Sequence, residues 1–400
     1  MVSIPSHDVL LTDGDCRITL YILRSLRKRG IDTVVAADRE RPLLFFSRFC
    51  RWRTCHPYPN PKENRRRFVE SIIRLVQKNR FNVLFPVCEW GLLPLSEMRD
   101  KIEPYTKMPL PSHESLVKTF DKSQTIKIAK DNDVPTPETY FVQSTRRLRE
   151  VSKKISYPAV IKPKWSWTWS EEKAIFRRAS YVKSPAELIT TYKAIHEQFP
   201  FPMIQEYIPG MARNYSIGVL YNNSRPRAMC AIKVYRAFPI SGGNSILRET
   251  VELDCKMKEY ASRLLKALDW HGIAEIEFKV DPRDGTPKLM EINGRFWASL
   301  EIAILSGVDL PYLLYRLTMD GDVPPVTGYK IGVKDRWLEG DIHHLYNVFR
   351  HKFGIQYPSR LRTLLDFFKI YEKDLYYDCY DPEDPLPFLV SLYRIKNKSI

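Results

Sequence analysis

Short apolar runs alternate with amphipathic segments over the first part of the chain. The runs at 8–13, 33–37 and 82–86 have the length and apolar character of buried strands. Between them apolar residues recur at helical spacing, first after Asp15, which is expected to cap its helix, and again over 68–76. This β-α-β-α-β order predicts a parallel sheet. The turn after the first run has one glycine, so it lacks the GxGxxG pattern of a dinucleotide site.

The next segment combines one helix with strands around a tryptophan-rich sequence. Asp121 is expected to cap the helix, and strands are expected at 139–142, 156–163 and 179–182. The sequence WSWTWSEEKA, residues 165–174, joins the last two strands with three tryptophans and no glycine. Two strands with such a tip are typical of a lid over a binding site.

Longer strands follow in the middle of the chain. We interpret 203–208, 215–220 and 228–235 as strands of one antiparallel sheet. Asp254 is expected to cap a helix with an apolar stripe. After about residue 325 the pattern predicts two helices and tyrosine-rich loops.

Length and composition restrict the class of protein. With 400 residues, the chain is long enough for two or three domains, and its 44% hydrophobic content excludes a disordered protein. No apolar run approaches the roughly 18 residues of a spanning helix, and the start lacks the layout of a signal peptide. Seven scattered cysteines without a CxxC pair indicate free thiols. We therefore expect a cytoplasmic protein without a membrane partner.

The charge balance favours an anionic partner. Lysines and arginines number 63 against 47 acidic residues, which gives a net charge of +16. Nucleic acid, a membrane surface and a phosphorylated small molecule are all anionic partners that a protein of this charge could bind. The sequence has no RNA-binding signature, so nucleic acid is not the expected partner. The arginine run at 65–67 is interpreted as a solvated helix face.

The most informative segment is GIAEIEFKVDPRDGTPKLMEINGR, residues 272–295. It predicts two alternating strands around a turn in which Gly285 is left-handed. In the register that this turn sets, Glu277 faces Glu291 and Glu275 faces Asn293. Like charges on opposite strands destabilise a sheet, so this face requires a counter-charge.

The other face of the hairpin is expected to be apolar, with Phe278 opposite Met290. A hard divalent cation would satisfy the carboxylates, because Mg²⁺ prefers oxygen ligands. The alternative is a solvated face on which Lys279 and Arg295 neutralise the acids. Periodicity alone leaves both interpretations open.

Four motifs occur in order along the chain. They are FDKSQ at 120–124, AVIKP at 159–163, IQEYIPG at 204–210 and LMEINGRFWASLEIAILSGVDLPYLLYRL at 289–317. Their order resembles the ATP-grasp superfamily, in its carbamoyl-phosphate synthetase and biotin carboxylase branch. The last motif is similar to that of predicted carboxylate–amine ligases.

The resemblance implies an α/β and α+β fold in four parts. A pre-ATP-grasp, Rossmann-like domain with a parallel sheet would occupy 1–111. The ATP-grasp fold would follow as a small lid subdomain, 112–200, and a large subdomain with the metal-binding hairpin, 201–325. A mostly helical extension would occupy 326–400.

The resemblance also implies roles for individual residues. Mg²⁺ or Mn²⁺ would be held by Glu277, Glu291 and Asn293. Lys162 and Arg295 are the implied catalytic residues, beside the transferred phosphate. The implied ATP contacts are Lys122, Lys162, Gln205, Glu206, Tyr207, Ile208 and Asn214. The implied substrate-pocket residues are Arg236, Gly242, Gly243 and Arg248.

Two positions depart from the family pattern. Asn214 stands near the usual ribose-binding glutamate. The tryptophans of 165–170 stand where family members commonly have a glycine-rich loop over the phosphates.

The implied activity is ligation. ATP would convert a carboxylate to an acyl-phosphate, and an amine would then displace phosphate, chemistry that requires positioning and charge neutralisation. The implied partners are a small-molecule carboxylate and an amine, and a homodimer is compatible with this activity. Two alternatives stay open: a nucleotide sensor or scaffold that has lost turnover, and a basic nucleic-acid-binding protein.

Overall fold

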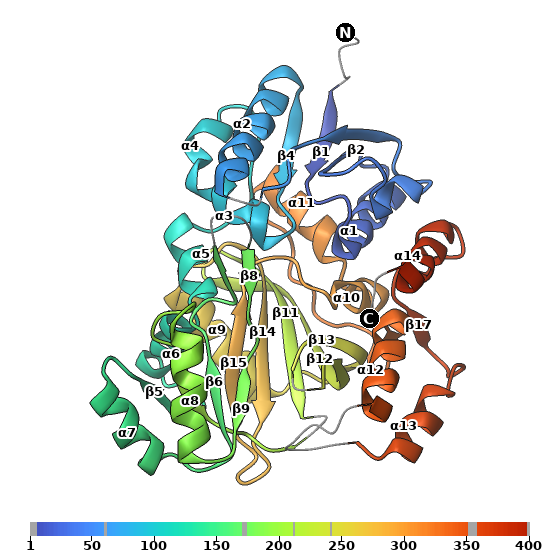
Figure 1. Cartoon of the computed structure of the whole chain (residues 1–400). Coiled ribbons are helices and arrows are strands. Elements are labelled where there is room, and N and C mark those ends of the chain that lie inside the picture. The colour runs from blue at the N-terminus through green and yellow to red at the C-terminus, as the bar shows by residue number, and fades with distance from the viewer. Residues whose placement is uncertain are drawn as a thin grey trace.

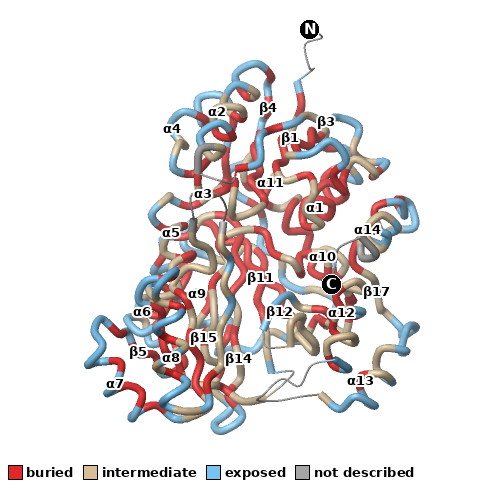
Figure 2. The backbone as a smooth tube through the Cα atoms, viewed as in Figure 1, coloured by how far each residue is buried: buried red, intermediate tan, exposed pale blue. Residues whose placement is uncertain are grey.

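The computed structural model describes residues 6–59, 62–169, 174–210, 213–240, 242–350 and 358–397. Its three larger sheets lie in different parts of the molecule, with the N-terminal sheet at the top of Figure 1 and the largest sheet in the centre. Buried residues concentrate between the sheets and their helices (Figure 2). Among the described helices, none has an apolar stretch long enough to span a membrane.

The N-terminal sheet is parallel, with the order β3-β2-β1-β4, which confirms the predicted parallel sheet. Strands β1 (His7–Leu11), β2 (Thr33–Ala37) and β4 (Phe81–Phe85) are mostly buried. Strand β3 (Trp52–Cys55) was not predicted, because it is a mostly exposed edge strand without an apolar run. The helical segments of this domain are α1 (Arg17–Lys28), η1 (Leu43–Phe46), α2 (Lys62–Lys78), α3 (Glu89–Glu97) and α4 (Arg99–Ile102).

The expected cap of α1 is wrong by one residue. Cys16 is the N-cap residue, and its side chain makes no cap hydrogen bond. The Asp15 carboxylate instead accepts a hydrogen bond from the backbone N–H of Leu43 at 2.7 Å. The first turn of α1 therefore has no side-chain cap.

A small antiparallel sheet has the order β5-β10-β6-β9. Its strands are β5 (Thr139–Phe141), β6 (Ala159–Lys162), β9 (Ser180–Val182) and β10 (Met203–Glu206). Helices α7 (Thr145–Lys154) and α8 (Pro185–His196) cover it through an apolar cluster. A separate hairpin, β7 (Trp167–Trp169) and β8 (Ala174–Phe176), lies between β6 and β9 in the sequence.

The position of β10 corrects one interpretation. The sequence placed 203–208 in one sheet with 215–220, but β10 pairs with β5 and β6, and Ile204 packs in the small sheet's cluster. Its apolar alternation predicted a strand correctly. Alternation does not identify the neighbouring strand, since pairing is a long-range property.

The largest sheet has seven strands in the order β15-β14-β11-β12-β13-β16-β17. They are β11 (Asn214–Asn222), β12 (Arg225–Phe238), β13 (Asn244–Val251), β14 (Gly272–Val280), β15 (Pro287–Asn293), β16 (Lys334–Arg336) and β17 (Leu375–Tyr377). Side chains alternate between the faces, so Val219 and Leu220 enter different apolar clusters.

Helices cover both faces of this sheet. One face packs against α5 (His113–Phe120), α6 (Lys122–Asp131) and α9 (Cys255–Ala267). The other packs against α10 (Leu300–Leu305) and α11 (Leu310–Asp320), which also contact α1. Helices α10 and α11 thereby join the N-terminal domain to the largest sheet. Asp121 and Asp254 cap α6 and α9 as predicted.

The β14–β15 hairpin has the predicted register over its carboxylates. Glu275 lies opposite Asn293, and Glu277 lies opposite Glu291. A bulge then leaves Met290 without an opposite residue, so the predicted pairing of Phe278 with Met290 is wrong. Gly285 is left-handed, with φ of 72°.

The C-terminal segment has more structure than predicted. The sequence indicated two helices, whereas the described residues form α12 (Leu338–Arg350), α13 (Arg360–Phe367) and α14 (Leu386–Asn397). Strands β16 and β17 also extend the largest sheet. Both strands have three residues, too few to show an alternating pattern.

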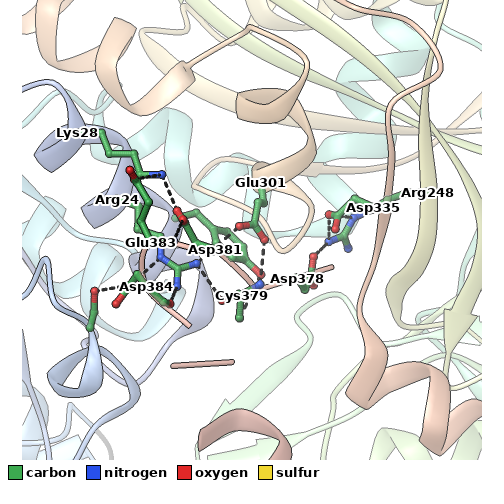
Figure 3. Close-up of polar contacts among 12 residues, drawn as sticks. Arg24, Lys28, Arg248, Glu301, Asp335, Asp378, Cys379, Asp381, Glu383 and Asp384 are labelled. Atoms are coloured by element: carbon green, nitrogen blue, oxygen red, sulfur yellow. Dashed lines mark hydrogen bonds and ion pairs between the residues drawn. The ribbon is translucent and has the colours of Figure 1, made fainter. Parts of the chain in front are cut away.

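A buried ion network connects this segment to the rest of the fold (Figure 3). The Arg248 guanidinium, on β13, pairs with Asp335 of β16 and with Asp378, and all three side chains are fully buried. Arg17 of α1 donates to the same Asp378 carboxylate at 2.8 Å. Arg24, about two turns farther along α1, pairs with Asp384 at 2.9 Å. Asp378 thus contacts the N-terminal domain and the largest sheet together.

We expect Arg248→Met to destabilise the protein strongly, because it leaves the buried Asp335 carboxylate without its cation and Asp378 with Arg17 alone. Breaking a buried ion pair costs about 3–5 kcal/mol. The measurement is the denaturant midpoint of unfolding by circular dichroism. Arg66→Met is the control, since Arg66 is exposed and its one ion pair within the described part of the chain is with Glu70 along α2. Equal, small shifts for both variants would contradict the expectation.

Candidate active site

A cavity of about 2000 Å³ lies over the β14–β15 hairpin, between the small sheet, the first turns of α1 and α3 and the C-terminal segment. It brings together nearly all of the residues predicted from the sequence. Those that line it are Lys122, Lys162, Gln205, Glu206, Tyr207, Ile208, Asn214, Arg236, Gly242, Gly243, Glu277, Glu291, Asn293 and Arg295. Arg248 is the exception.

Three carboxylates and one amide meet on the hairpin face. Asn293 Nδ2 donates to Glu275 at 3.0 Å and to Glu277 at 2.9 Å. Burial, together with the charges of Glu275 and Glu291, raises the pKa of Glu277 to about 8. This concentration of oxygen ligands and negative charge suits a hard divalent cation. Glu275 was not predicted as a ligand, and it also accepts a hydrogen bond from Ser299 at 3.2 Å.

Two lysines approach the same carboxylates from other elements. Lys122 Nζ, at the start of α6, lies 2.7 Å from Glu291 Oε1 and donates to Ser166 at 2.8 Å. Lys162 is at the end of β6, and burial lowers its pKa to about 8 although Glu291 acts in the opposite direction. Burial also opposes ionisation of Glu291, but the Lys122 and Lys162 charges hold the pKa of that carboxyl below its usual range.

Arg295 lies where the hairpin meets the N-terminal domain. Its Nη1 donates to the backbone carbonyl of Phe296 at 2.9 Å, and its Nε is 3.9 Å from Glu89 Oε2. Glu89 is the first residue of α3, and burial raises its pKa although Arg295 acts against this shift. Arg295 therefore faces a carboxylate from another domain as well as the hairpin.

The sequence analysis missed Glu89. Its position carries the signal that was available, because Glu89 follows β4 at the carboxyl edge of a parallel sheet. Ligands of open α/β sheets bind at that edge.

The segment predicted to contact adenine lies at the end of β10. Gln205 is buried; its Nε2 donates to Thr139 at 2.9 Å, while Oε1 has no hydrogen-bond partner among the described residues. The Glu206 carboxylate pairs with Lys288 at 2.6 Å and with Arg283 at 2.9 Å. Glu206 is therefore already neutralised by two cations.

Aromatic side chains hold the lid hairpin against the N-terminal domain. The Trp167 ring on β7 lies 4.0 Å from that of Trp90 on α3 and 4.4 Å from that of Phe176 on β8, measured between centroids. Ser170, one of the predicted lid residues, is outside the described part of the chain. The described tryptophan-rich segment thus contacts a different domain through its side chains.

The residues predicted for the substrate pocket divide into two groups. Gly242 and Gly243 line the cavity, and so does Arg236, which pairs with Asp341 at 2.7 Å. The prediction for Arg248 is wrong: its side chain is fully buried within the ion network and does not reach the cavity. Strand alternation explains this outcome, since Leu247 and Glu249 on either side of it do line the cavity.

Comparison with known proteins identifies the fold. A family model described as "ATP-grasp in the biosynthetic pathway with Ter operon" matches residues 198–340. The D-aspartate ligase of Enterococcus faecium is 24% identical over 261 residues, which cover 61% of each chain. The large chain of carbamoyl phosphate synthase from Pyrococcus furiosus is 22% identical over 57% of this chain and 20% of that protein. The chain therefore spans less than two thirds of these relatives.

Solved structures agree. Biotin carboxylase from Campylobacter jejuni aligns with a TM-score of 0.64 at 17% identity, and the alignment covers 82% of this chain and 74% of the carboxylase chain. L-amino acid ligase from Bacillus licheniformis aligns with a TM-score of 0.60 at 15% identity, and the alignment covers 81% of this chain and 79% of the ligase chain. The chain has the ATP-grasp fold, and the resemblance to the carbamoyl-phosphate synthetase and biotin carboxylase branch is confirmed.

We expect Trp167→Ala to loosen the lid hairpin. Each aromatic pair contributes about 0.5–1.5 kcal/mol, so losing both contacts should raise local amide exchange roughly tenfold. Hydrogen exchange with mass spectrometry over 164–169 and 174–178 measures the effect. Tyr105→Ala removes a half-exposed aromatic ring that does not line the cavity and serves as control. Unchanged exchange in the Trp167 variant would show that the contacts do not hold the hairpin.

Proposed function

We propose that the protein is an ATP-dependent ligase that activates a carboxylate as an acyl-phosphate and joins it to an amine, with release of ADP and phosphate. The observation that carries this proposal is the meeting of the hairpin carboxylates with Lys122, Lys162 and Arg295 in one cavity. Phosphoryl transfer needs such an arrangement, because fixed cations must face the phosphates while a metal neutralises charge between them.

Glu277, Glu291 and Asn293 would hold the metal, Mg²⁺ or Mn²⁺. The donor set fits, because these side chains share one face of a hairpin and supply only oxygen ligands. The pKa of Glu277 is raised because the group is buried beside two other carboxylates, and a bound cation would offset this excess of negative charge. A metal bound there would neutralise part of the negative charge of the phosphates.

The protein's own cations would position ATP. Lys122 would exchange its contact with Glu291 for a phosphate oxygen, and Lys162 would approach from β6. Arg295 is anchored on one side by the Phe296 carbonyl, which leaves donors for the charge that develops on the acyl-phosphate. At the other end, the Gln205 Oε1 atom would accept a hydrogen bond from the nucleotide base, beside Tyr207 and Ile208.

Relatives support ligation without identifying the substrates. Two similar proteins are named D-aspartate ligase and L-amino acid ligase. This chain covers 61% of the former, and its likeness to the latter shows the fold alone, so the acyl-phosphate route and a cytoplasmic place of action stay predictions.

We expect Glu291→Gln to reduce ligase turnover by at least a hundredfold, since it removes a metal ligand and the partner of Lys122. The assay combines Mg·ATP with pooled amino acids and small carboxylates, and follows ADP, phosphate and new masses. Glu259→Gln is the matched control, because Glu259 is exposed on α9 and, among the residues that the structure describes, pairs with Arg263 alone. Its turnover should be unchanged.

Each other outcome has a defined meaning. Unchanged turnover in folded Glu291→Gln would refute the proposed site. AMP and pyrophosphate as products would show that the carboxylate is activated as an adenylate and not as an acyl-phosphate. Nucleotide binding without turnover under every substrate would favour the sensor alternative.

A further inference from the structure

Two cysteines occupy the N-cap positions of the helices that begin at the cavity wall. Cys16 precedes α1 and Cys88 precedes α3, and neither side chain makes a cap hydrogen bond in the described structure. Serine, threonine, aspartate and asparagine stabilise this position, whereas a thiol is a weak hydrogen-bond acceptor. Capping therefore does not account for the two thiols.

The N-terminal sheet places these two positions side by side. Strands β1 and β4 are parallel neighbours, and each helix begins shortly after the carboxyl end of its strand. Asp13 connects the two helix starts: its backbone carbonyl accepts a hydrogen bond from the Cys16 N–H at 2.9 Å, and its carboxylate accepts one from the Cys88 N–H at 3.0 Å. One residue thus fixes the backbone of both cysteines.

The two thiols are in contact. The Cys88 thiol donates a hydrogen bond to the Cys16 sulfur, which lowers the pKa of Cys16 although burial acts in the opposite direction. The same bond, together with burial, raises the pKa of Cys88 well above its usual value. Both residues are partly exposed and line the cavity, so a small molecule in the cavity meets them there.

The difference between the two sulfurs suits thiol–disulfide exchange. The thiolate is the attacking form in this reaction, and a helix start or a nearby cation favours it. Cys16 has both, because it precedes α1 and lies beside the Arg17 guanidinium. Cys88 is the sulfur within reach that can complete the reaction. The contact between the thiols leaves side-chain rotation and a small approach of the two helix starts to close a bond of about 2 Å.

We infer that Cys16 and Cys88 form a reversible disulfide, with a low-molecular-weight disulfide as the oxidant. The Cys16 thiolate attacks one sulfur of the oxidant, which forms a mixed disulfide and releases a thiolate that takes a proton from solvent. The Cys88 thiol then loses its proton to solvent, attacks the Cys16 sulfur and displaces the second thiolate, which is protonated in turn. The two cysteines are oxidised by two electrons, and the oxidant is reduced to two thiols. This chemistry goes beyond the proposed ligase function, because it needs no ATP, carboxylate or amine.

The disulfide also acts on the lid hairpin. Its formation draws the start of α3 toward that of α1, since the new bond is shorter than the contact between two thiols. Trp90, two residues after Cys88, packs against Trp167 of the hairpin with 4.0 Å between ring centroids. A gap of about 0.5–1 Å removes a quarter to a half of such a contact. Oxidation therefore loosens the hairpin.

The test exposes the full-length protein to increasing ratios of oxidised to reduced glutathione. Peptide mass spectrometry without reduction should find a linked pair of peptides that contain Cys16 and Cys88 and have lost two hydrogens. Dithiothreitol should remove the link. Cys255, an exposed cysteine at the start of α9, should carry glutathione and so shows that the reagent was active.

Three variants separate the roles of the two sulfurs. Cys88→Ser should leave Cys16 as a stable mixed disulfide with glutathione, since the second sulfur is missing. Cys16→Ser should leave Cys88 mostly reduced, because its thiol retains its proton. Serine is a favourable N-cap residue, so both variants should fold, which circular dichroism checks. Cys255→Ser is the matched control and should form the Cys16–Cys88 link like the parent.

Hydrogen exchange over 164–169 and 174–178 measures the effect on the lid hairpin. Exchange in the parent should rise about twofold on oxidation, the size expected from losing part of one aromatic contact. It should stay unchanged in Cys16→Ser under the same oxidising conditions.

The contrary outcomes are specific. The inference is overturned if the folded parent forms no Cys16–Cys88 link while Cys255 carries glutathione. Glutathione on Cys88 of the Cys16→Ser variant, with Cys16 unmodified in Cys88→Ser, would overturn the assigned roles. Unchanged hairpin exchange in fully oxidised parent protein would overturn the effect on the lid.

Discussion

The fold depends on one buried carboxylate. Asp378 accepts hydrogen bonds from Arg17 of α1 and Arg248 of β13, and it lies directly after β17. Because isolated charges are very costly in the interior, neither guanidinium can stay buried unless the C-terminal segment is in place. The segment is therefore an integral part of the sheet and of the N-terminal domain's attachment. The same carboxylate holds Arg17, which lines the cavity, so the stability of the fold and the position of this part of the cavity wall depend on one contact.

A second constraint is the like charge on the hairpin. Glu277 and Glu291 face one another across two paired strands, which a sheet tolerates only when cations are near. The fold brings Lys122 from α6 and Lys162 from the small sheet. In this arrangement the carboxylates and the cationic side chains partly neutralise one another. The carboxylates can still bind a metal, and the lysines and Arg295 can still bind phosphate. The electrostatics of the site thus follow from how three separate elements are packed.

Patterns local in the sequence predicted the structure best. Alternation and one turn glycine were enough for the carboxylate register of β14 and β15, because both strands lie in one hairpin. The bulge at Met290 and the sheet to which β10 belongs were not predictable, since they depend on packing against distant elements. Arg248 shows the same limit. Its neighbours face the cavity, but the sequence around Arg248 could not predict that its guanidinium would be buried in ion pairs with Asp335 and Asp378.

The lid shows how a family feature can be replaced. A glycine-rich loop offers free backbone N–H groups to phosphates, whereas β7 and β8 use backbone groups to pair with each other. Polar contact is instead made by side chains, as in the bond from Lys122 to Ser166. The aromatic contact of Trp167 with Trp90 places the hairpin against α3, whose first residue is Glu89. The position of the lid therefore depends on the helix that contributes Glu89 and Trp90 to the cavity wall.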